Sequence, residues 1–171
     1  MVFQAHAYVE DEFLLSLANT ILIRHPSRVI ASLLRLKPDF SEEELGFVAI
    51  DQLFQRMQRL QGKPPLVIEG ERFRANPGDT LRRYCTANSL GYSAAMLHWQ
   101  SGNLRTWLPH EHESQQPWHR TLESSQTILP PSGQIPTLHL APEQQALLER
   151  ALATYTRLLD LAMPTSEPMH H

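Results

Sequence analysis

The chain has 171 residues, of which 42% are hydrophobic, and this suits one domain whose core needs no disulfide or metal to hold it. A formal net charge of -3 excludes a general attraction to nucleic acid or to an anionic membrane. A single cysteine excludes an internal disulfide, and no apolar run is long enough to span a bilayer. We therefore expect a cytoplasmic protein with no membrane partner.

Three helices are predicted in the first sixty residues. Acidic residues at 10–12 precede an apolar stripe that continues through residues 13–23, and Pro26 ends it. A second helix is expected over residues 27–37. A third opens at Ser41, which has the capping-box spacing to Glu44, and runs to about residue 60. The short connections between the three helices predict a small bundle.

Residues 66–109 have a different pattern. Gly70-Glu71 separates LVIE (66–69) from RFRA (72–75), which predicts a short β-hairpin. Residues 79–101 have the order helix, glycine turn, helix, typical of a helix-turn-helix DNA reader. The expected second helix carries few of the long polar side chains that contact bases, so a helical corner without DNA is the favoured interpretation. LRTWLP (104–109) is a candidate third strand.

The segments FRAN, PGDTL, LGYS, WQSGN and WLP follow one another within residues 71–109. In this order they resemble the LysM module, a β-α-α-β unit. The resemblance implies binding of N-acetylglucosamine polymers. The chain departs from that pattern because its first helix is longer and the segment before its last strand is shorter. Asp79 is equally well explained as a helix N-cap.

A connector is expected over residues 110–141, which contain four prolines, and it ends the helical domain of residues 1–109. Residues 142–163 then predict an amphipathic helix with Pro142 in its first turn. A seam on this helix is expected to dock on the rest of the chain or in a homodimer. It consists of Leu148, Leu152, Tyr155 and Leu159.

No catalytic residue, cofactor or metal is predicted. His110, His112 and His119 lie in one loop and offer imidazole ligands for zinc or nickel, but a solvated connector explains them better. Cys85 falls inside a predicted helix, where a buried structural thiol is expected.

The expected fold class is mainly α: a small helical bundle with a short β-hairpin and a C-terminal docking helix. Arginine, tryptophan and tyrosine are enriched at binding hot spots, and all three gather within residues 72–118. The working hypothesis is a non-enzymatic regulatory or assembly factor that binds a protein partner through this surface. The alternative is a helix-turn-helix DNA-binding regulator that uses residues 79–101. The predicted interaction residues are Arg72, Arg74, Arg82, Arg83, Trp99, Arg105, Trp107 and Trp118.

Overall fold

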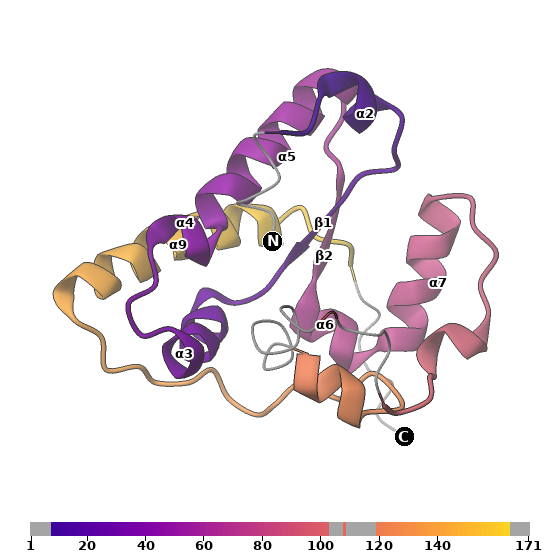
Figure 1. The fold of residues 1–171 in the computed structure, drawn as a ribbon. Helices are drawn as coiled ribbons and strands as arrows, with labels where there is room; N and C mark the ends of the chain where they lie inside the picture. Colours follow the sequence, from indigo (N-terminus) through magenta and orange to yellow (C-terminus); the bar gives the residue numbers. More distant parts are fainter. Residues whose placement is uncertain (1–7, 103–107, 109–118, 165–171) are drawn as a thin grey trace. The chain divides into compact units, whose positions relative to one another are not determined.

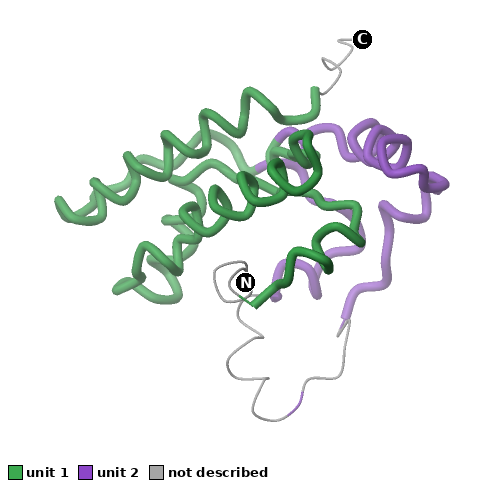
Figure 2. The backbone as a smooth tube through the Cα atoms, turned by 90° about the horizontal axis from the view of Figure 1, so that it is seen from above, with its two compact units in different colours: residues 1–71, 132–164 green, residues 72–131, 165–171 purple. Residues whose placement is uncertain are grey.

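The computed structural model describes residues 8–102, 108 and 119–164, and it divides the chain into two compact units (Figure 2). Unit 1 consists of residues 1–71 and 132–164, and unit 2 consists of residues 72–131 and 165–171.

A pair of parallel strands forms the centre of unit 1 (Figure 1). Strand β1 (Thr20–Ile23) pairs with β2 (Leu66–Glu69), so that Thr20 lies opposite Leu66 and Ile23 lies opposite Glu69. Parallel strands need a long crossover connection, and here it is helical. The crossover contains α3 (Pro26–Leu36), α4 (Glu42–Leu45) and α5 (Phe47–Gln61).

Helix α9 (Pro142–Leu159) completes the core of unit 1 by packing against α3, α5 and both strands. The predicted seam of α9 faces this core, with Leu148 and Tyr155 buried and with Leu152 and Leu159 half-buried beside them. Residues from all these elements share one apolar cluster, whose most deeply buried side chains include Ile23, Ile30, Phe54, Val67 and Leu158.

The first predicted helix is only partly correct. Helix α2 (Asp11–Leu15) stops early, and the rest of the apolar run forms β1. Thr20, Ile21 and Ile23 are β-branched, which favours a strand over a helix once a partner strand is present. The predicted hairpin is not confirmed, because β2 pairs with β1 and residues 70–75 form α6 (Gly70–Ala75).

Unit 2 differs from the predicted helix-turn-helix. Helix α7 (Pro77–Ala87) is present, but the second helix is only a four-residue 3-10 turn, η1 (Ala94–Leu97). Because residues 70–75 are helical, the β-α-α-β order of a LysM module is not found either. The candidate strand at 104–109 lies outside the described residues except for Leu108. Residues 119–124, within the predicted connector, are helical.

The mainly α prediction is confirmed, with a small parallel sheet as the described β structure. Across the described ranges, no helix is long and apolar enough to cross a membrane.

His25 fixes the start of α3. Its Nδ1 atom accepts a hydrogen bond from the backbone N–H of Ser27 at 3.2 Å, which satisfies one of the donors left open at a helix N-terminus. The His25 ring also packs edge-on against the ring of Tyr155 in α9, with 5.1 Å between the ring centroids. These two contacts tie the first turn of α3 to the core.

The surroundings of His25 favour its neutral form. Burial lowers the pKa of His25 below its ordinary value of 6.5, and the positive charge of Arg28 lowers it further. The carboxylates of Glu69 and Glu71 oppose these two effects without outweighing them. The neutral ring keeps Nδ1 available as the acceptor that caps α3.

We expect the protein to lose stability as the pH falls below about 6.5, because unfolded His25 takes up a proton at a higher pH than folded His25 does. His25→Asn retains a side-chain acceptor for the Ser27 N–H but does not titrate. Urea unfolding at about pH 7.5 and about pH 5.5 gives the free energy of unfolding at each pH. Between the two pH values, this free energy should fall more for the wild type than for the variant. Equal losses would contradict this role of His25.

Gly46 joins α4 to α5 with a φ of +82°, in the left-handed region. Gly46→Ala should lower the free energy of unfolding by about 1–2 kcal/mol, since a Cβ atom disfavours this conformation. Gly91 is the matched control, because its φ is not positive and a Cβ atom added there would have no other atom within 4 Å. Denaturant unfolding should show little change for Gly91→Ala, and an equal loss in both variants would refute the conformational argument.

Candidate functional site

Charged side chains gather where the two parallel strands end. Arg24 follows β1 directly, and Arg28 lies in the first turn of α3. Glu69 is the last residue of β2, and Glu71 lies in the first turn of α6. The carboxyl ends of parallel strands are the usual place for ligands in α/β proteins. We define these four residues as the strand-end cluster.

The carboxylate of Glu71 lies between two guanidinium groups. Arg24 donates from Nε to Glu71 Oε1 at 2.8 Å, and Arg28 Nε lies 3.8 Å from Glu71 Oε2. The side chains of Arg28 and Glu71 are only 9% and 17% exposed, whereas Arg24 is 40% exposed. One flank of the cluster is therefore buried, and Arg24 forms its open side.

Arg28 is fixed by contacts on both sides of its guanidinium. Its Nη1 donates to Ser132 Oγ at 3.1 Å, and its Nη2 donates to the carbonyl oxygen of Gly133 at 2.6 Å. The Arg28 Nε atom is buried and makes no hydrogen bond within the described residues. This donor faces the Glu71 carboxylate at ion-pair distance, so the guanidinium is held in position with one strong donor still available.

The strand-end cluster is suited to holding an oxyanion. Guanidinium groups bind carboxylate, sulfate and phosphate oxygens through charge-assisted hydrogen bonds, and burial strengthens such contacts. Here the anion held by both arginines is the chain's own carboxylate, that of Glu71. The two cations and two acids balance in formal charge, which limits the cost of burying them.

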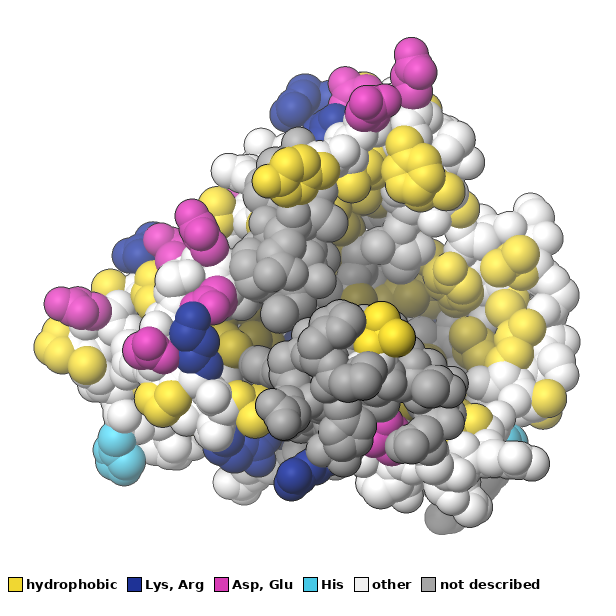
Figure 3. All heavy atoms as spheres, in the orientation of Figure 1, with side chains coloured by type: hydrophobic (Ala, Val, Ile, Leu, Met, Phe, Trp, Pro, Cys, Tyr) yellow, Lys and Arg dark blue, Asp and Glu magenta, His cyan; other side chains and the backbone are white. Residues whose placement is uncertain are grey.

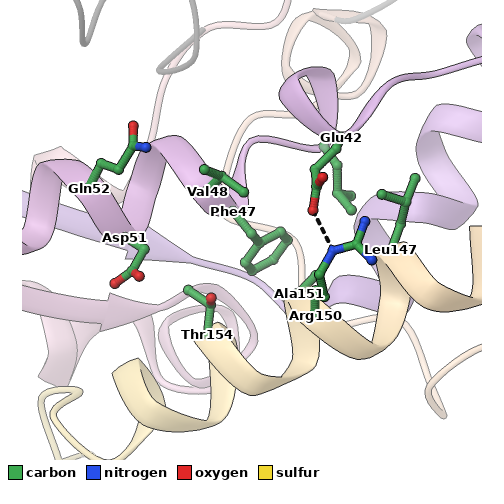
Figure 4. Close-up of a pocket in the computed structure, with 10 residues that line it drawn as sticks. Glu42, Phe47, Val48, Asp51, Gln52, Leu147, Arg150, Ala151 and Thr154 are labelled. Atoms are coloured by element: carbon green, nitrogen blue, oxygen red, sulfur yellow. Dashed lines mark hydrogen bonds and ion pairs between the residues drawn. The ribbon is translucent and has the colours of Figure 1, made fainter.

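A cavity of 280 Å³ lies elsewhere in unit 1, between α5 and α9 (Figure 4). Its floor is apolar, with Leu45, Phe47 and Ala151 buried. At its rim, Arg150 donates to Glu42 at 2.7 Å, and Asp51 pairs with Arg157. Figure 3 shows acidic and basic side chains next to one another over α4 and α9. These pairs each join one arginine to one acid, whereas in the strand-end cluster two arginines face the same carboxylate.

Several predicted interaction residues make contacts within unit 2. Arg74 donates to the carbonyl oxygens of Leu129 and Pro130, and Arg83 pairs with Asp79 at 2.8 Å.

The guanidinium of Arg82 lies over the Tyr92 ring, 4.6 Å from its centroid. Trp99 is half-buried, and its indole N–H donates to the carbonyl oxygen of Leu122 at 3.3 Å. Arg72 is exposed, and Cys85 is buried as predicted.

Arg105, Trp107, Trp118, His110 and His112 lie outside the described residues. His119 is described and half-buried. Within residues 8–102, 108 and 119–164, no three His, Cys, Asp or Glu side chains group closely enough to hold a metal ion. The homodimer and the protein partner stay predictions.

Sequence reasoning missed Arg24, Arg28 and Glu71. A signal was present, because IRHPSR (23–28) places two arginines around a proline at the point where a strand gives way to a helix. The prediction of one helix over residues 13–23 concealed this signal, because it contains no strand end. Glu71 had no local signal, since it reaches Arg24 only through the pairing of β1 with β2.

Comparisons with known proteins identify relatives. Two Arabidopsis thaliana proteins, named branched-chain-amino-acid aminotransferase-like proteins 1 and 2, are each 28% identical over 141 residues. The alignment covers 81% of this chain but only 23% of either relative, so their names describe much longer proteins. No solved structure matches the chain significantly.

The family model described as "Sulfotransferase domain" matches residues 4–162. This match points to a transferase enzyme, so the hypothesis of a non-enzymatic regulatory or assembly factor is wrong. The alternative of a helix-turn-helix DNA-binding regulator is wrong for the same reason, and the described residues 94–97 form a 3-10 turn where it requires a second α-helix. Because the match covers nearly the whole sequence, the chain belongs to the sulfotransferase domain family.

Proposed function

We propose that the chain takes part in sulfuryl transfer and that Arg24 and Arg28 hold the negatively charged group of a sulfate-bearing donor. The observation that carries the proposal is the pair of guanidinium groups converging on one carboxylate at the carboxyl ends of β1 and β2. A donor of this kind presents sulfate oxygens of the same charge sign and hydrogen-bonding capacity as that carboxylate.

Sulfuryl transfer moves an SO₃ group from a donor oxygen to an acceptor oxygen or nitrogen. The S–O bond to the donor breaks, the new bond to the acceptor forms, and the proton of the acceptor is released. Fixed positive charges hold an anionic donor, and they speed transfer where negative charge develops in the transition state. Arg28 is such a fixed charge, because its contacts to Ser132 and Gly133 hold it in place.

Arg24 and Arg28 differ in what they offer a ligand. Arg24 is the more exposed of the two and is well placed to meet an entering anion. Arg28 is nearly buried, so its charge acts in surroundings where water screens it less. Arg24 thus offers an anion an accessible contact, and Arg28 offers it a contact that water screens less.

Binding is tested with inorganic sulfate as the probe, by calorimetric titration at constant ionic strength. Arg24→Gln and Arg28→Gln should each weaken sulfate binding by about tenfold, because each removes a charge-assisted hydrogen bond. Arg150→Gln is the matched control, since Arg150 is also an arginine of unit 1 paired with a glutamate. Equal loss in the control, or unchanged affinity in both cluster variants, would contradict the site.

Transfer itself is tested with p-nitrophenyl sulfate as donor and a second phenol as acceptor. Nitrophenol released in step with sulfation of the acceptor would support the proposed reaction. Arg24→Gln should lower that rate while Arg150→Gln leaves it unchanged. A wild-type rate equal to that of buffer alone would count against the reaction.

A further inference from the structure

Glu71 occupies the position that an anionic ligand of the strand-end cluster would need. Both of its carboxylate oxygens face arginine, with 2.8 Å from Arg24 Nε to one oxygen and 3.8 Å from Arg28 Nε to the other. The Nε donor of Arg24 is already used by Glu71, so an anion that takes this donor must displace the Glu71 carboxylate from it. A bound anion therefore competes with Glu71.

The backbone brings Glu71 to this position. Ile23 lies opposite Glu69 at the end of the sheet, and Gly70 follows at once. A Cβ atom on Gly70 would lie 3.3 Å from the carbonyl oxygen of Ile23, so glycine permits the close approach of the two strand ends. Glu71 is the next residue along and starts α6 beside Arg24. Its placement follows from the sheet register and does not depend on a long flexible segment.

We propose that Glu71 is an internal competitor that sets the anion affinity and charge selectivity of the strand-end cluster. This inference rests on the proposed function, since it concerns the same two arginines. Glu71 carries one negative charge and already lies within ion-pair distance of both cations. A monoanion gains little by replacing it, whereas a dianion such as sulfate gains more attraction from the same two guanidinium groups. Glu71 thereby reserves the site for strongly charged ligands.

The test compares Glu71→Gln with the wild type in titrations with inorganic sulfate and with nitrate at constant ionic strength. Glutamine keeps the shape of the side chain but removes the competing charge. Sulfate should bind about tenfold more tightly to the variant, and nitrate should gain at least as much, because the charge that excluded it is gone. Glu42→Gln is the matched control, since Glu42 pairs with Arg150 outside the cluster, and it should leave both affinities unchanged.

A double variant separates failure of this inference from failure of the proposed function. Adding Arg24→Gln to Glu71→Gln should abolish the gain, because the freed guanidinium is the group that the anion binds. If the wild type binds sulfate and loses it on Arg24→Gln, but Glu71→Gln binds no more tightly, Glu71 only positions the arginines and the inference is overturned. If neither the wild type nor Glu71→Gln binds sulfate, the proposed function fails as well.

Folding of the variants is checked by thermal unfolding followed by circular dichroism. If Glu71→Gln does not fold, Glu71→Asp replaces it, since the shorter side chain withdraws the carboxylate from the arginines while keeping its charge. Glu71→Asp should also bind sulfate more tightly than the wild type, by a smaller factor. Unchanged or weaker sulfate binding in a folded Glu71→Asp variant would overturn the inference.

Discussion

The parallel pairing of β1 with β2 is the constraint on which unit 1 depends. It joins two segments that lie far apart in the sequence, and the helical crossover between them supplies much of the core. Because the strands are parallel, both carboxyl ends lie at the same edge, which places Arg24 and Glu71 in contact. An antiparallel pairing of the same two strands would put these residues at opposite edges.

Membership of the sulfotransferase domain family supports the proposal that an anionic ligand binds at this edge. Arg28 is nearly buried and is oriented by its contacts to Ser132 and Gly133, so an anion that binds there would meet a preorganised group. His25 contributes to this arrangement by capping α3, the helix that carries Arg28, and its neutral form adds no further positive charge. The cluster is thus supported by the helix that begins at it.

Local features were predictable from the sequence because local physics decides them. The capping box of Ser41 and Glu44 is present, α9 begins at Pro142, and Cys85 is buried. Strand β1 was not predicted because its four residues continue an apolar run. The apolar residues of this run keep helical spacing up to Leu22, so the pattern favours a helix as much as a strand. The candidate site depends on that strand and on its long-range pairing, so the local arginine pattern of residues 23–28 was not enough to locate it. In unit 2, the sequence predicted two α-helices on either side of the glycine turn. The first is present as α7, but the second is the short 3-10 turn η1.

The most direct test of the account is a crystal structure of the chain with selenate, a tetrahedral dianion whose selenium atom scatters anomalously. The account predicts an anomalous peak within hydrogen-bonding distance of the guanidinium groups of Arg24 and Arg28, with the Glu71 carboxylate moved away from both. Selenate bound only at other places, with Glu71 still between the two arginines, would contradict it.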